Sequence, residues 1–146
     1  MQQLFDQYLL DSSVISIGRT ITEADIVLHA GQTGDFYPHH MDAEWCKSFS
    51  PFGQRVAHGT LVLVVAVGML AGEINEAAFS YGYDRIRFIA PVFIGDTITS
   101  KGVIVGKRDY AKNPEEFGIV EEQVTVTNQR GETVIAFMHL YLVRKK

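Results

Sequence analysis

A short segment of this chain, residues 34–40, brings together side chains that can move protons. It reads Gly-Asp-Phe-Tyr-Pro-His-His, so the carboxylate of Asp35 lies five residues before the imidazole of His40. The proline between them limits the backbone conformations of the segment. Eighteen residues after His40, His58 and Gly59 open the most apolar run of the sequence. These residues predict a general base, a general acid and an oxyanion site around one cavity, which suits adding water to an activated acyl group or removing it.

The residues before Asp35 predict the helix that presents it. Thr22 is a typical N-cap residue, and the acidic side chains of Glu23 and Asp25 follow it near the positive end of the helix dipole. We therefore expect a helix over residues 23–33. Gly34 suits the left-handed conformation that ends a helix, so Asp35 lies where the chain leaves it.

The apolar run over residues 59–71 has Thr60 as its one polar side chain. Its valines favour a strand locally, whereas its length favours a helix. We predict a central buried helix, surrounded by protein because it is apolar on every side. The N–H of Gly59 then lies at the amino end, where free N–H groups and the helix dipole favour negative charge.

The rest of the sequence has the patterns of strands and turns. The last strand is apolar on both faces, which indicates an internal strand or an interface. The sequence thus predicts one α+β domain over residues 1–146, an antiparallel sheet wrapped around a helix. The expected elements are a strand at 16–20, a short helix capped by Asp42, and strands at 79–88, 97–105, 119–127 and 133–143.

Composition excludes some classes of function. The chain has 146 residues, 47% hydrophobic and 21% charged, with a net charge of −4, so nucleic acid is not an expected partner. The first residues lack the pattern of a secretory signal, and the apolar stretch is too short to span a membrane, which needs about 20 residues. One cysteine, Cys46, excludes an internal disulfide and is compatible with a reducing compartment, so we expect a cytoplasmic protein.

Three segments together resemble one known family, the MaoC-like, R-specific enoyl-CoA hydratases. Residues 34–40 resemble its G-D-x-N-P-x-H signature, residues 55–59 (RVAHG) resemble the start of its central helix, and residues 87–96 resemble a linker between strands. The resemblance extends from about Gly18 to the C-terminus. It implies the hot-dog fold, in which a curved antiparallel sheet wraps a long helix. It also implies dimers, or higher homo-oligomers, with joined sheets and an acyl-CoA tunnel near the interface.

The resemblance also implies roles for residues. Asp35 is expected to be the main base in hydration, and His40 to orient the same water and share proton transfer. The N–H of Gly59 is expected to bind the thioester oxygen. The implied reaction converts a 2-enoyl-CoA to an R-3-hydroxyacyl-CoA, or the reverse. Coenzyme A is part of the acyl-CoA substrate, and no separate cofactor is expected.

Two positions depart from the family pattern. Tyr37 stands where the family usually has Asn, and His39 stands where an aliphatic residue is more common. Tyr37, His39 and His58 are candidate substrate-binding residues, and Tyr37 in the wall would influence the choice of acyl group. Alternatively, Tyr37 points outward and His58 packs or caps at the helix start. A metal site is not expected, because no cysteine or carboxylate spacing completes a zinc set with these histidines.

Other residues have structural readings, and other functions stay open. His29 and His139 are expected to be structural, and Cys46 to be a packed thiol. A hot-dog thioesterase usually carries a carboxylate on the central helix, and residues 59–72 contain none. A non-catalytic acyl-CoA-binding module is the third alternative, against which Asp35 and His40 argue.

Overall fold

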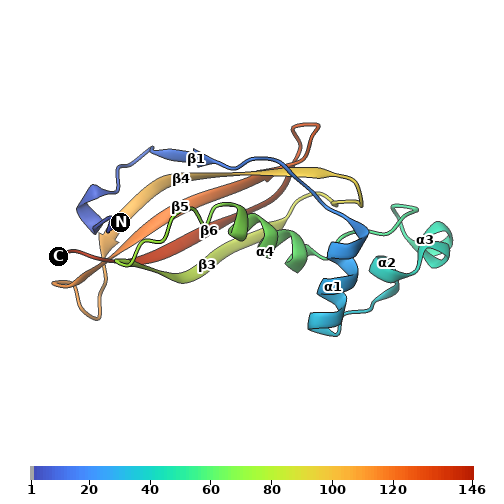
Figure 1. Cartoon of the computed structure of the whole chain (residues 1–146), viewed down its shortest axis with the longest axis horizontal. Coiled ribbons are helices and arrows are strands. Elements are labelled where there is room, and N and C mark those ends of the chain that lie inside the picture. Colours follow the sequence, from blue (N-terminus) through green and yellow to red (C-terminus); the bar gives the residue numbers. More distant parts are fainter. Residues whose placement is uncertain (1) are drawn as a thin grey trace.

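The structure, a computed structural model, describes residues 2–146 (Figure 1). A short 3-10 helix precedes two short strands, four helices and four long strands. In chain order the elements are η1 (Phe5–Gln7), β1 (Ser13–Ile15), β2 (Arg19–Thr20), α1 (Glu23–Thr33), α2 (Pro38–Met41), α3 (Ala43–Phe49), α4 (Gly59–Met69), β3 (Ala78–Phe88), β4 (Thr97–Asp109), β5 (Phe117–Thr127) and β6 (Thr133–Arg144).

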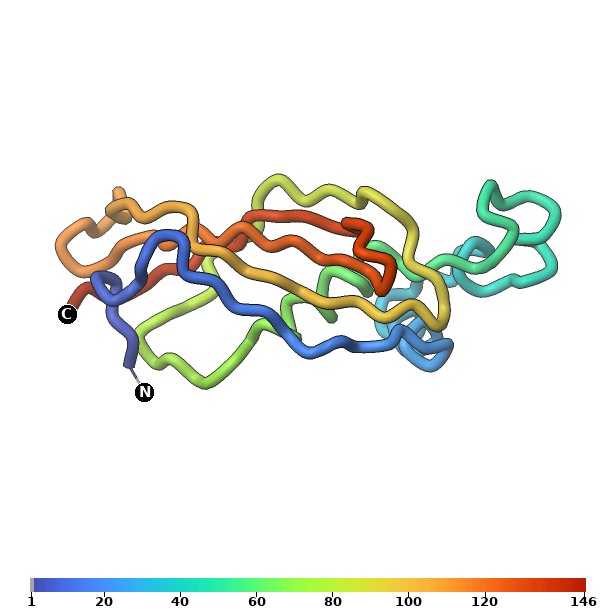
Figure 2. The backbone as a smooth tube through the Cα atoms, turned by 90° about the horizontal axis from the view of Figure 1, so that it is seen from above, coloured from blue at the N-terminus to red at the C-terminus, as the bar shows by residue number. Residues whose placement is uncertain are grey.

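The strands form one antiparallel sheet in the order β1-β4-β5-β6-β3, with β2 also pairing with β4. Three of the four long strands, β4, β5 and β6, run side by side along the molecule (Figure 2). Strand β6 lies between β5 and β3, so its two apolar faces belong to an internal strand, as predicted. The strand and hairpin expectations are confirmed for all four long strands.

One face of the sheet packs against α4. Alternate residues of β5 and β6, including Val124 and Phe137, form a buried cluster with Leu61, Val62 and Ala66 of the helix. This arrangement confirms the α+β fold with a sheet curved around a helix. The prediction that α4 is surrounded by protein is wrong for the single chain, however. Val64 is 55% exposed, because the sheet and its connections cover only one side of the helix.

The first three helices extend beyond one end of the sheet (Figure 1). Helix α1 begins and ends as predicted: Thr22 and Asp25 form a capping box, and Gly34 closes the helix with a φ of 81°. Asp42 caps α3 through the N–H of Trp45. Helix α2 was not predicted. Pro38 occupies its first turn, where a missing N–H costs nothing.

The strand expected over residues 16–20 is wrong in its bounds. The chain pairs with β4 twice, through β1 and through β2, with a break between them. At the break, the hydroxyl of Ser16 accepts a hydrogen bond from the Ser100 N–H at 2.9 Å, in place of a backbone carbonyl. This hydrogen bond to a side chain interrupts the regular backbone pairing with β4.

We expect the protein to sediment as a dimer or a larger oligomer. Edge strand β3 exposes three aromatic side chains, Phe79, Tyr81 and Tyr83, and α4 exposes Val64. Exposed aromatic and apolar side chains on an edge strand and on a helix are typical of an interface. Analytical ultracentrifugation in moderate salt measures the mass directly, and a fully active monomer would contradict this expectation.

None of the helices in residues 2–146 is both long enough and apolar enough to cross a membrane.

Candidate active site

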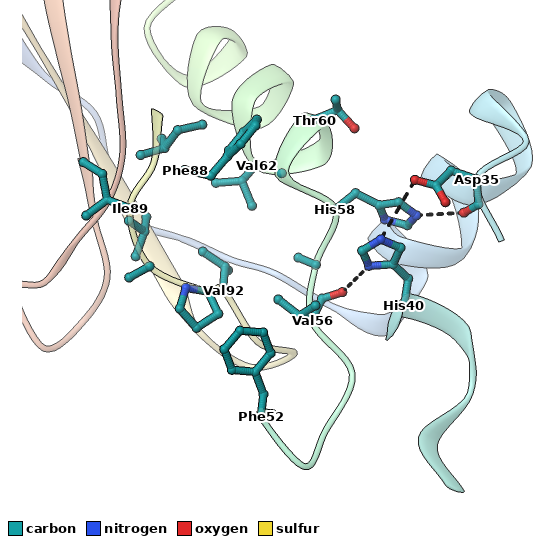
Figure 3. Close-up of a pocket in the computed structure, with 16 residues that line it drawn as sticks. Asp35, His40, Phe52, Val56, His58, Thr60, Val62, Phe88, Ile89 and Val92 are labelled. Atoms are coloured by element: carbon teal, nitrogen blue, oxygen red, sulfur yellow. Dashed lines mark hydrogen bonds and ion pairs between the residues drawn. The ribbon is translucent and has the colours of Figure 1, made fainter. Parts of the chain in front are cut away.

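A cavity of about 600 Å³ opens at the amino end of α4 (Figure 3). Asp35, His40, His58 and Gly59 all line it, so the fold brings together the residues expected to do chemistry. They come from three places: the end of α1, helix α2 and the start of α4. The opposite wall is apolar and includes Val62, Val92, Phe88 and Ile135.

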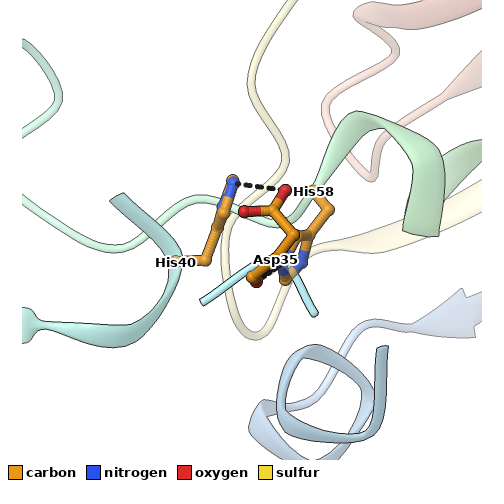
Figure 4. Close-up of side chains that lie close together, drawn as sticks. All are labelled: Asp35, His40 and His58. Carbon is orange, nitrogen blue, oxygen red and sulfur yellow. Dashed lines mark hydrogen bonds and ion pairs between the residues drawn. The ribbon is translucent and has the colours of Figure 1, made fainter. Parts of the chain in front are cut away.

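Asp35 and His40 face each other across a gap that is too wide for a direct hydrogen bond. The Oδ2 of Asp35 lies 3.9 Å from the Nε2 of His40 (Figure 4). The other ring nitrogen, Nδ1, lies 2.7 Å from the carbonyl oxygen of Val56, and only a protonated Nδ1 can donate there. In a neutral His40, Nε2 is therefore an acceptor, and one water can donate a hydrogen bond to each partner.

The environment favours a neutral His40. Burial lowers its pKa, against the raising effects of its bond to the Val56 carbonyl and of the nearby Asp35 charge. The side chain of Asp35 is half exposed and so keeps contact with solvent. The pair thus offers a carboxylate and a neutral imidazole to the same small space.

His58 supports this pair from behind. Its residue is 1% exposed, its ring stacks on His40 with centroids 3.8 Å apart, and its Nε2 donates to the backbone carbonyl of Asp35 at 2.9 Å. Its backbone caps α4, but its side chain makes no capping hydrogen bond. His58 therefore lines the cavity and also fixes the backbone that carries Asp35.

His29 and Thr60 join the site unexpectedly. The Nε2 of His29 lies 2.8 Å from the hydroxyl of Thr60, and its ring centroid lies 4.8 Å from that of His58. Burial lowers the pKa of His29, as does the nearby His58. The sequence placed His29 on α1 one turn before Thr33, but only the packing of α1 on α4 shows which residue it meets.

The amino end of α4 has no room for a side chain at residue 59. A Cβ on Gly59 would lie 2.7 Å from the ring of Phe88, which real Cβ atoms essentially never do. The absence of a side chain keeps the first N–H groups of the helix accessible from the cavity. Such N–H groups stabilise negative charge on a bound oxygen.

Tyr37 and His39 lie outside the wall of this cavity, which corrects their expected place. Their rings pack on each other, with centroids 5.0 Å apart, and on Trp45 of α3. Helix α2 begins at Pro38, and its turn of about 100° per residue directs neighbouring side chains to different sides. His40 therefore faces the cavity, whereas Tyr37 is 57% exposed on the surface.

Replacing Tyr37 by Asn is accordingly expected to leave the ranking of acyl substrates unchanged. The side chain contacts His39 and Trp45 rather than the cavity, so its loss removes surface packing only. Relative rates across a panel of enoyl-CoAs measure this. A changed ranking would show that residue 37 reaches the acyl group in the assembled oligomer.

Among the described residues, Asp35, His40 and His58 form the one group of side chains that could hold a metal ion. Their potential ligand atoms lie within 4.8 Å of one another. The Nδ1 of His40 and the Nε2 of His58 donate to carbonyl oxygens, as the second ring nitrogen of a metal-binding histidine commonly does, so these hydrogen bonds do not decide the question. Zinc binds nitrogen at about 2.0–2.1 Å, which would require these side chains to move together. The donor set suits proton transfer better than metal binding.

The fold and the site define a hot-dog protein with an Asp–His pair at the amino end of its helix. A Mycobacterium tuberculosis protein with a double hot-dog fold superimposes with a TM-score of 0.82, at 21% identity, over 99% of this chain and 45% of its own. Residues 9–128 match the model of the MaoC like domain, so the chain belongs to the MaoC-like family.

The similar proteins differ in sequence identity and in the share of each chain that aligns. The chain is 37% identical over 98 residues to protein MaoC of Klebsiella aerogenes, which is 66% of this chain but only 29% of that protein. It is 33% identical over 91 residues to an (R)-specific enoyl-CoA hydratase of Rhodospirillum rubrum, 62% of either chain. The structure of an Archaeoglobus protein, described as a monoamine oxidase regulatory protein, has a TM-score of 0.92 at 36% identity, over 99% of this chain and 96% of that one.

Proposed function

We propose that this protein adds water to a 2-enoyl-CoA to give an R-3-hydroxyacyl-CoA, or catalyses the reverse dehydration. The observation that carries the proposal is the pair of proton acceptors, Asp35 Oδ2 and His40 Nε2, 3.9 Å apart beside the amino end of α4. The likeness to an (R)-specific enoyl-CoA hydratase supports it. The apolar far wall, with Val62 and Val92, suits an acyl chain.

The first step places the water. It donates one hydrogen bond to Asp35 and one to His40, so its lone pair is left free to point at C3 of the enoyl group. As the oxygen bonds to C3, Asp35 takes a proton from the water, and the C2–C3 double-bond electrons move towards the thioester oxygen.

In the second step the negative charge on the thioester oxygen is stabilised and a proton is added to C2. The negative charge on the thioester oxygen is met by the N–H of Gly59 and by the positive end of α4. His40 holds the water in place and shares the transfer, and the proton that Asp35 took from the water is delivered to C2. The product carries one hydroxyl at C3 and one new hydrogen at C2, so the atoms of one water are used. In dehydration the same groups act in reverse.

A panel assay tests the proposal against its alternatives. Loss of the absorbance of the conjugated enoyl thioester is measured with short, long, methyl-branched and dicarboxylic enoyl-CoAs. Hydration predicts absorbance loss without release of free thiol. Thiol release would indicate a thioesterase instead, and tight binding without turnover would indicate an acyl-CoA-binding module.

The pH profile of kcat/KM should show an acid limb with a midpoint below pH 6.5. Hydration needs neutral His40, and burial lowers the pKa of that imidazole below its ordinary value of 6.5. Activity is therefore retained as the pH falls to 6.5 and is lost only at lower pH, as the ring becomes protonated. Initial rates from pH 4.5 to 8 locate the midpoint. A midpoint above 6.5 would contradict this assignment.

A further inference from the structure

A second cavity, of about 310 Å³, lies beyond the carboxyl end of α4, whereas the site described above is at its amino end. Its walls come from residues 70–75, the N-terminal segment and the sheet. Seven polar side chains line it: Gln3, Tyr8, Glu73, Asn75, Ser80, Glu122 and Tyr141. The proposed hydration uses none of them.

Two of these side chains, Ser80 and Glu122, form an ordered array with His139 across three neighbouring strands. The hydroxyl of Ser80 on β3 lies 2.7 Å from the Nε2 of His139 on β6. The Nδ1 of His139 lies 3.7 Å from the Oε1 of Glu122 on β5, within ion-pair range but too far for a direct hydrogen bond. A hydroxyl, an imidazole in hydrogen-bond reach of it, and a carboxylate behind the imidazole is the arrangement that activates a nucleophile.

Burial, a hydrogen bond and the space beside a glycine fix the position of the Glu122 carboxylate. Glu122 is only 5% exposed, and the Tyr141 hydroxyl donates to its Oε1 at 2.9 Å. On the neighbouring strand, Gly102 leaves the space that Glu122 occupies, because a Cβ there would lie 2.5 Å from Oε2. A buried carboxylate is costly unless it has such partners.

The imidazole is also in a setting that suits a base. Its ring lies between two tyrosine rings, with centroids 4.5 Å from Tyr83 and 4.1 Å from Tyr141. Aromatic faces stabilise a nearby cation, and an imidazolium forms when His139 takes a proton.

Hydroxyl groups beside Ser80 can meet the negative charge of a reacting carbonyl. The Ser80 hydroxyl, besides its contact with His139, can donate to the Tyr83 hydroxyl at 3.1 Å, which leaves the hydrogen of Tyr83 free to donate. The Tyr8 hydroxyl accepts a hydrogen bond from the Asn75 side chain at 3.2 Å, which leaves its own hydrogen to donate. Burial raises the pKa of Tyr8, so this hydroxyl stays protonated at neutral pH.

We propose that Ser80, His139 and Glu122 form a second active site, which hydrolyses small carboxylic esters or thioesters. Ser80 Oγ bonds to the carbonyl carbon as its proton passes to His139 Nε2. The C–O or C–S bond to the leaving group then breaks, and the leaving alcohol or thiol takes that proton. Water repeats the sequence on the acyl-serine, giving the carboxylic acid and free Ser80. This activity does not depend on the proposed hydration.

The first test is labelling of the whole protein with a fluorophosphonate, which bonds phosphorus to an activated serine oxygen and releases fluoride. We expect one adduct, mapped by peptide mass spectrometry to Ser80, and none in Ser80→Ala. His139→Gln and Glu122→Gln should slow labelling by about 100-fold or more, the usual contribution of a general base. Hydrolysis of 4-nitrophenyl acetate should fall in the same variants.

Matched variants separate this site from the first one and from general reactivity. Ser48→Ala, at an exposed position on α3, should label at the unchanged rate. Asp35→Asn should reduce hydration by about 10²–10⁴-fold and leave Ser80 labelling intact. Ser80→Ala should abolish labelling and leave hydration unchanged.

Should His139→Gln fail to fold, cysteine variants replace it. Ser80→Cys should be alkylated by iodoacetamide at least about 10-fold faster than Ser48→Cys, because only residue 80 has a base at hydrogen-bond distance. The proposal is overturned if Ser80 is not labelled, if Ser48 is labelled equally fast, or if the two cysteines react alike.

Discussion

Asp35→Asn and His40→Ala should each reduce turnover of an enoyl-CoA by about 10²–10⁴-fold, the usual contribution of a general acid–base group. The amide of Asn cannot take a proton from the bridging water, and alanine removes the acceptor opposite it. Both groups lie at the edge of the cavity, with Asp35 half exposed, so the fold should survive. Single-turnover kinetics measure the chemical step, and circular dichroism checks the fold.

The two substitutions should not be additive. In the proposed mechanism both residues act on one water, so the double variant should lose much less than the product of the two single losses. His39→Ala is the matched control, because the imidazole of His39 is next to His40 in the chain but packs against Trp45 outside the cavity. Near-normal turnover in Asp35→Asn would remove the proposed mechanism altogether.

Gly59→Ala should reduce turnover by about 10²–10³-fold, the loss expected when an oxyanion donor is displaced. The new methyl would meet the ring of Phe88 at 2.7 Å, so either the ring or the start of α4 must shift. A shift of the helix start would move the N–H groups proposed to bind the thioester oxygen, and a shift of the ring would change the cavity wall beside them. The effect should fall mainly on kcat, because the charge on that oxygen develops in the transition state.

Gly68→Ala provides the control within the same helix. Nothing lies within 4 Å of a Cβ at residue 68, and alanine is the better helix former by about 1 kcal/mol. This variant should keep its activity and unfold at a higher temperature. If both glycine variants were fully active, the amino end of α4 would have no part in catalysis.

Local sequence signals predicted most of the elements correctly. The bounds of α1 followed from Thr22, Asp25 and Gly34, because capping depends on residues close in the chain. The strand at 119–127 followed from alternation of apolar side chains, and the other three long strands followed from strand-like composition between turn signals. Helix α2 and the break after β1 were missed. One is a single turn, and the other depends on the Ser16 hydroxyl bonding to residue 100, far along the sequence.

The sequence by itself determined the fold class, the family and the order of the reactive groups, because these depend on spacing along the chain. Only the tertiary structure decided which side chains share a cavity. It turned His40 inward and Tyr37 outward, and it placed His29 against Thr60. It also assembled Ser80, Glu122 and His139 from three strands. No local pattern encodes that array, since cross-strand neighbours are set by the pairing and register of the whole sheet.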